Sequence, residues 1–146
     1  MKMSGYFTLT WLIIMIVSFL VSRLLLIDYL GLSDDDNVSW LDIFSGITFV
    51  FTLRFVFFLS LSSITIFLNL FKKIRSNWFL SLLTYLLIPV GTFLSIVFGD
   101  IFEESFKYEN LKSGFKFAAC VVLPHLAISL LCFLHFRRLM QKGKLN

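Results

Sequence analysis

The chain has 146 residues, enough for one domain, and 58% of them are hydrophobic, against about 45–50% in a soluble domain. Charged residues make up 15% and lie in clusters between long apolar runs, so a soluble protein of this size could not bury its apolar surface. The net charge of +4 comes from basic residues that flank apolar segments rather than from a basic face, so we expect no nucleic-acid partner.

Four apolar segments are each long enough to cross a bilayer, which takes about 20 residues in a helix. We expect all of them to be helical, because open strands cannot satisfy their backbone groups in lipid. The sequence therefore predicts an all-α membrane protein, a four-transmembrane-helix bundle that forms a single domain of residues 1–146. The predicted spans are about 7–27, 44–71, 78–98 and 115–136.

Charge in the connecting segments predicts the orientation of the bundle. All nine carboxylates lie in the two predicted outer loops, 28–43 and 99–114, whereas the turn at 72–77 and both ends of the chain carry basic residues and no acid. Loops rich in Lys and Arg stay on the cytoplasmic side. We therefore predict an N-in/C-in protein, with both termini in the cytoplasm of a bacterial cytoplasmic membrane.

The two outer loops contain local helix signals. Ser39 and Asp42 have the spacing of a capping box, which favours a helix start near Trp40. Apolar residues at 101, 102 and 106 share one helical face, which predicts a short helix on the outer membrane surface.

Ionisable side chains at membrane depth are candidate site residues, because burying them in lipid is costly. Arg23 and Arg54 both lie about 24–25 Å from the cytoplasmic ends of their helices at 1.5 Å per residue, and Ser95 reaches the same layer. Two interpretations remain open for this layer. The arginines could extend to lipid phosphates or pair with loop carboxylates, or they could form an outward-facing site for an anion or for a partner's acidic residue.

His125 follows Pro124 and lies about 18 Å from the cytoplasmic end of the fourth span, slightly above the midplane. It could be a hydrogen-bonded packing residue or a proton relay. Pro124 and Pro89 are expected to kink their helices and so to free carbonyl groups that His125 could reach.

Small residues recur every four positions in two spans, Ser18 and Ser22 in the first and Gly91, Ser95 and Gly99 in the third. Such spacing lets helix backbones approach closely. Because the two stripes lie at matching depths, we predict contact between the first and third spans, with homodimerisation through one stripe as the alternative.

No catalytic, metal-binding or cofactor-binding motif is present, and the only histidines, His125 and His135, are too far apart on one helix to share a metal. The sequence favours a small, non-enzymatic membrane protein that binds another membrane protein, as an accessory subunit or an immunity-type protein, with membrane lipids as its surroundings. The alternatives are a small lipid or anion carrier that uses the arginine layer and a membrane enzyme that uses His125 as a base.

Overall fold

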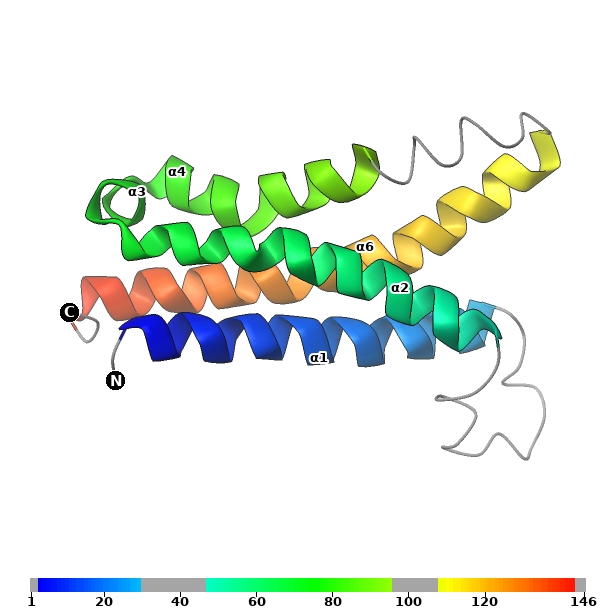
Figure 1. Ribbon diagram of the computed structural model, residues 1–146, viewed down its shortest axis with the longest axis horizontal. Coiled ribbons are helices and arrows are strands. Elements are labelled where there is room, and N and C mark those ends of the chain that lie inside the picture. Colours follow the sequence, from blue (N-terminus) through cyan, green and yellow to red (C-terminus); the bar gives the residue numbers. More distant parts are fainter. Residues whose placement is uncertain (1–2, 30–46, 96–107, 144–146) are drawn as a thin grey trace.

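The computed structural model describes residues 3–29, 47–95 and 108–143 (Figure 1), and these residues are helical throughout except at short turns. The first span is α1 (Met3–Tyr29), and the second is α2 (Ile47–Ser62) continued by η3 (Ser63–Leu70). After the short α3 (Lys72–Ser76), the third span consists of α4 (Trp78–Leu82), η4 (Leu83–Leu87) and residues 88–95, and the fourth is α6 (Tyr108–Gln141).

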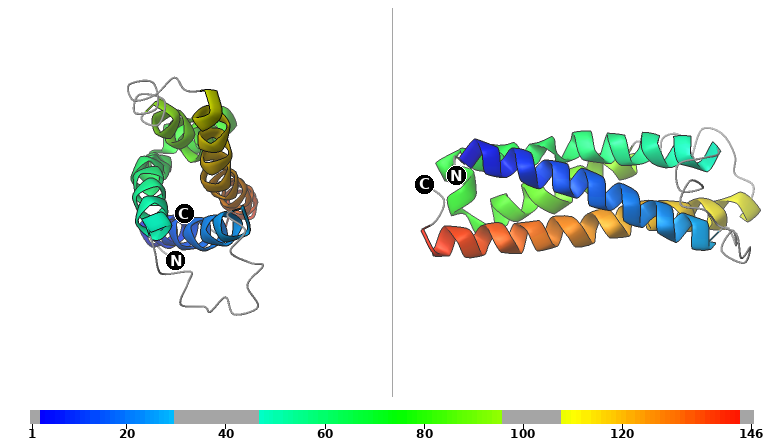
Figure 2. Two further views of the ribbon diagram at one scale, coloured as in Figure 1. Left: turned by 90° about the vertical axis from the view of Figure 1, so that its right-hand side faces the viewer. Right: turned by 90° about the horizontal axis from the view of Figure 1, so that it is seen from below.

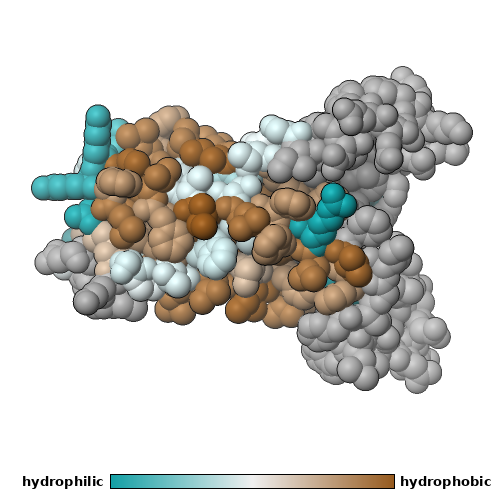
Figure 3. All heavy atoms as spheres, viewed as in Figure 1, coloured by the Kyte–Doolittle hydropathy of each residue, from teal (hydrophilic) through white to brown (hydrophobic). Residues whose placement is uncertain are grey.

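Four helical stretches are long and apolar enough to cross a membrane, so the predicted all-α membrane architecture is confirmed and the chain is an integral membrane protein. The candidate spans are Met3–Asp28, Thr52–Leu70, Trp78–Ser95 and Ala118–Gln141. Both termini lie at the same end of the bundle (Figure 1), and hydrophilic side chains gather at that end beside a hydrophobic belt (Figure 3).

The four spans occupy the corners of an elongated bundle (Figure 2, left). α1 packs mainly against α6 and the second span, while the third span packs on η3 and α6. The first and third spans are therefore diagonal at the end of the bundle that faces the viewer.

Several predicted boundaries need correction. The turn predicted at 72–77 contains the helix α3, and residues 108–114, predicted as part of an outer loop, belong to α6. That helix continues through Pro124, and its N-terminal part is inclined to the rest, as predicted from the proline (Figure 1). The predicted cap at Ser39 and surface helix at 101–107 lie outside the described residues.

The second span changes from α-helix to a 3-10 helix of eight residues at Ser63. Runs of 3-10 helix longer than three or four residues are uncommon. The change coincides with hydroxyl side chains that bond to nearby carbonyls, since Ser62 donates to the carbonyl of Phe58 and Ser63 to that of Leu59. A change from i−4 to i−3 bonding leaves a carbonyl without a backbone donor, and the Trp11 indole of α1 donates to the Ser60 carbonyl at 2.7 Å.

The third span contains one turn of π-helix, η4, in which the Ile88 amide donates to the Leu83 carbonyl five residues before it. Pro89 follows directly, and its ring and missing N–H prevent regular α-helical bonding to the preceding turn. The proline therefore accounts for the irregular backbone.

The π turn and the 3-10 helix pack on each other, and polar side chains join them. The Thr65 hydroxyl donates to the Thr84 carbonyl at 2.8 Å, and the Asn69 amide donates to the Thr84 hydroxyl at 2.7 Å. The Thr84 hydroxyl also lies 2.8 Å from the Ser81 carbonyl, to which it donates. These contacts hold the second and third spans together as a hairpin.

The turn of the hairpin is fixed from two sides. The Asn77 side chain caps α4 by accepting from the amides of Phe79 at 2.9 Å and Leu80 at 3.2 Å. The Arg137 guanidinium of α6 donates to the Arg75 carbonyl at 2.8 Å. The end of α6 is thereby attached to the connection between the second and third spans.

Replacing Thr84 with Val keeps the side-chain shape but removes the acceptor for Asn69. We expect Thr84→Val to lower the free energy of unfolding by about 1 kcal/mol, because a buried interhelical hydrogen bond is lost. The measurement is reversible unfolding in mixed micelles with increasing denaturing detergent. Thr92→Val is the control, since the Thr92 hydroxyl bonds only to carbonyls of its own helix, on an exposed face. Equal losses of unfolding free energy in the two variants would contradict the role of Thr84 as an interhelical hydrogen-bond acceptor.

Candidate functional site

A fully buried polar cluster is centred on His125 and joins three helices. Nδ1 of His125, on α6, lies 3.2 Å from the Ser18 hydroxyl of α1, and Nε2 lies 2.8 Å from the Ser63 hydroxyl of η3. The exposed fractions of these three side chains are 1% or less. The sequence singled out His125 as a candidate site residue and Ser18 as a packing residue, and Ser63 only as one of several hydroxyls in the second span that could bond either across helices or to their own backbone. The adjacent Ser62 is only half-buried, and the sequence alone does not separate the two serines.

The hydrogen bonds determine which atom in this cluster is the donor and which is the acceptor. The Ser63 hydroxyl donates its only proton to the Leu59 carbonyl at 2.9 Å, so its oxygen accepts from Nε2–H of His125. In a neutral imidazole Nδ1 is then the acceptor, and it accepts from the Ser18 hydroxyl. Both ring nitrogens are therefore engaged, and His125 acts as a hydrogen-bonded link between helices.

The structure separates the two arginines that the sequence placed in one layer. Arg23 is 1% exposed and lies over the ring of Phe49 at 5.9 Å, whereas Arg54 is exposed and lies over the ring of Phe58 at 6.0 Å. Phe49 and Arg54 are five residues apart, so their directions around the helix axis differ by about 140°. Because Phe49 faces Arg23, Arg54 points to the outside of the bundle. Equal depth does not bring the two guanidinium groups into one site.

The small-residue stripe of the third span also faces outward. Gly91 and Ser95 are exposed, and a Cβ built at Gly91 would meet nothing within 4 Å. The Ser95 hydroxyl donates to the Gly91 carbonyl at 2.8 Å. Gly99 lies outside the described residues. The predicted contact of this stripe with Ser18 and Ser22 is wrong, because Ser18 is bonded to α6 and Gly91 and Ser95 face away from the bundle.

Several buried polar atoms have no hydrogen-bond partner within the described part of the chain. Polar groups buried without partners are rare in folded proteins and call for an explanation, such as bound water. All four spans contribute to this group. It consists of the hydroxyls of Ser22, Ser60, Ser81, Tyr85 and Ser129 and the amide oxygen of Asn69. Apart from their polarity within apolar runs, Tyr85 and Asn69 have no sequence feature that would single them out.

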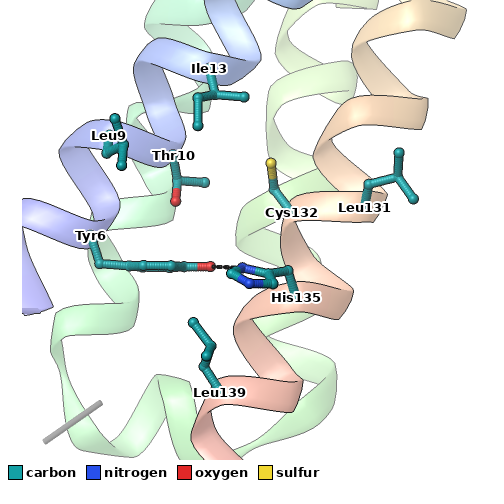
Figure 4. A pocket seen from close by; sticks show the side chains of 8 residues that line it. All are labelled: Tyr6, Leu9, Thr10, Ile13, Leu131, Cys132, His135 and Leu139. Atoms are coloured by element: carbon teal, nitrogen blue, oxygen red, sulfur yellow. Dashed lines mark hydrogen bonds between the residues drawn. The ribbon is translucent and has the colours of Figure 1, made fainter. Parts of the chain in front are cut away.

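A second polar contact lies near the termini, between α1 and α6. The Tyr6 hydroxyl is 3.2 Å from Nδ1 of His135, and these residues line a cavity of about 330 Å³ (Figure 4). Cys132, a free thiol, lies on the wall of the same cavity. Among the described residues no three His, Cys, Asp or Glu side chains are grouped so that they could hold a metal ion.

Replacing Ser63 with Ala removes the hydroxyl that connects His125 to the Leu59 carbonyl. We expect Ser63→Ala to lower the free energy of unfolding by about 1–2 kcal/mol, because it leaves a buried imidazole N–H without its partner. Ser62→Ala is the matched control, since that hydroxyl bonds only to a carbonyl of its own helix. Detergent-induced unfolding of both variants gives the comparison. A loss at Ser62 as large as that at Ser63 would contradict the role of the cluster.

Comparison of the chain with protein-family models, with curated proteins and with solved structures gave no match.

Proposed function

We propose that this chain is a non-enzymatic protein of a bacterial cytoplasmic membrane, with both termini in the cytoplasm, that acts by binding another membrane protein. The role would be that of an accessory subunit or an immunity-type partner. The contact surface is the exposed face of the third span around Gly91, Thr92 and Ser95.

The observation that carries this proposal is the outward placement of small residues in the third span. Gly91, Thr92 and Ser95 are exposed, and the hydroxyls of Thr92 and Ser95 donate to carbonyls of their own helix. In lipid, helices associate by close packing rather than by the hydrophobic effect, so a smooth face of small residues favours contact with another helix. The third span also has the smallest buried share of the four, 28%.

Arg54 supports a partner outside the bundle. It is exposed within the second candidate span, and its guanidinium lies over the Phe58 ring of its own helix. A guanidinium at membrane depth requires an anion or water nearby, and a carboxylate of a partner at this height would supply the anion. Lipid phosphates would serve the same purpose in the unbound protein.

The state of His125 argues against the enzyme alternative. A general base must have a nitrogen within reach of a substrate proton. Here both nitrogens are engaged by Ser18 and Ser63, and the side chain is 1% exposed. The geometry thus supports a structural role for this histidine.

Site-directed crosslinking tests the contact surface. In a chain with Cys120→Ser and Cys132→Ser, a single cysteine at position 91 or 95 is treated with a bifunctional thiol–photoreactive reagent in native membranes. We expect a defined adduct from these two positions and none from Leu131→Cys, because Leu131 is 62% exposed but lies on α6.

The mass of the adduct distinguishes the outcomes. An adduct whose mass is not a multiple of the 17.0 kDa chain supports a separate partner. An adduct of two copies indicates self-association through the same face and contradicts the proposal. Adducts of equal yield from positions 91 and 131, or only lipid adducts, would also contradict it.

A second candidate function, an anion carrier, is favoured by the burial of Arg23. A guanidinium that is 1% exposed within a span is suited to a polar path inside the bundle. The buried hydroxyls of Ser22 and Ser129, which have no hydrogen-bond partner among the described residues, would extend such a path.

This candidate predicts that Arg23→Gln abolishes anion efflux from proteoliposomes loaded with phosphate or a small carboxylate, because the buried positive charge is lost. Arg54→Gln should leave efflux unchanged, because Arg54 lies on the exposed surface of the bundle and not inside it. If the unmodified protein gives no efflux above that of protein-free liposomes, the carrier function is excluded for these anions.

A further inference from the structure

A groove lies between α1 and α6 at the end of the bundle that contains both termini. It has a volume of about 330 Å³, at the small end of the range for ligand sites. Its walls are the aliphatic side chains of Leu9, Ile13, Leu131 and Leu139. Figure 4 shows the Tyr6 ring reaching from α1 toward His135 of α6.

The position of the groove determines what can fill it. All its lining residues belong to the candidate spans Met3–Asp28 and Ala118–Gln141. Leu9 is 51% exposed and Leu131 is 62% exposed, so the groove opens toward the hydrocarbon region rather than toward water. An apolar groove in that region is suited to an acyl chain, and its volume is sufficient for part of one chain.

Positive charge lies at one end of the groove. Arg138 and Lys142 follow His135 at three and seven residues along α6, so all three lie on one side of the helix. The helical register continues to this point, because the Lys142 amide donates to the Arg138 carbonyl at 3.2 Å. Both side chains are exposed, and the sequence has no carboxylate after Glu109.

The Tyr6–His135 contact lies between the apolar side chains of Ile13 and Leu131 and the charged end of the groove (Figure 4). His135 is six residues, or about 9 Å, from the end of α6 at Gln141, so it lies close to the charged end of the groove. A lipid whose phosphate contacts Arg138 and Lys142 would place its glycerol backbone beside the Tyr6–His135 pair. From Ile13 and Leu131 toward the chain termini the groove changes from apolar to polar and then to cationic, with Leu139 beside the charges, and this order matches the parts of an anionic phospholipid.

We propose that this groove binds an anionic phospholipid from the leaflet beside the chain termini. One acyl chain lies along Ile13 and Cys132, and the phosphate contacts Arg138 and Lys142. The site is separate from the partner surface of the third span, because only α1 and α6 form it.

Alkylation of Cys132 reports occupancy of the groove. The full chain with Cys120→Ser, which leaves Cys132 as its only cysteine, is treated with N-ethylmaleimide in micelles that contain phosphatidylglycerol or phosphatidylcholine. Phosphatidylglycerol at about four times its dissociation constant should slow alkylation about fivefold, because only the empty groove reacts. Phosphatidylcholine at the same fraction should have little effect.

Charge variants identify the headgroup contacts. Arg138→Gln with Lys142→Gln should remove the difference between the two lipids. Lys72→Gln with Lys73→Gln removes the same charge from α3 and should preserve the difference. Retention of native elution volume and helicity in both variants ensures that folding is not the cause.

Three outcomes would overturn the proposal. Equal alkylation rates in the two lipids would show that the groove does not select an anionic lipid. Protection that persists in the Arg138/Lys142 variant would place the headgroup elsewhere. Equal protection by glycerol phosphate, which has the anion but no acyl chain, would show a site for a soluble anion rather than for a lipid.

Discussion

The hydrogen bonds of His125 are the contacts on which the arrangement of the bundle most depends. In lipid an apolar helix face gains little by exchanging acyl chains for another apolar face, so polar contacts and close packing decide which helices meet. His125 bonds to Ser18 of α1 and to Ser63 of η3, and it is itself on α6. Three of the four spans are thereby held at one depth. The remaining span, which is the third along the chain, is joined to η3 through Thr84.

The irregular backbone segments η3 and η4 supply groups for the hydrogen bonds between helices. The 3-10 helix begins at Ser63, the residue that bonds to His125, and the carbonyl of Ser60 just before it accepts from Trp11 of α1. The π turn lies opposite and presents the Thr84 carbonyl to Thr65. In a membrane each departure from α-helix frees backbone groups that must be bonded elsewhere. Here side chains of neighbouring helices supply those bonds, so the irregular turns also connect helices.

The outer surface of the bundle has two distinct faces. On the third span, small residues and hydroxyls bonded to their own helix leave a smooth face, which we propose as the contact with a protein partner. Between α1 and α6, aliphatic walls lead to the Tyr6–His135 contact and then to cationic side chains, which we propose as a lipid site. The two proposals are independent, since the residues that carry them lie on different helices.

Much of the architecture followed from the sequence alone. Apolar runs of about 20 residues specify the number of spans because hydrophobic thickness fixes helix length, and the even number of spans accounts for both termini lying at one end. Depth along each helix was also predictable, since the rise per residue is constant. His125 was selected from its depth as an ionisable residue and Ser18 from its spacing as a helix-packing residue, and the structure places both in one cluster.

Only the tertiary structure decided in which direction each residue faces. Every side of a membrane helix is apolar, so hydropathy gives little information about rotation around the helix axis; this is why Arg23 and Arg54 share a depth but lie inside and outside the bundle. The same limit explains why the predicted contact of Gly91 and Ser95 with the first span was wrong. Their spacing permits close helix approach but does not specify the partner helix. The sequence thus determined how many helices cross the membrane and the depth of each polar residue. The packing of the four helices determined which of those residues meet, because rotation and neighbour are fixed only when hydrogen bonds between helices form.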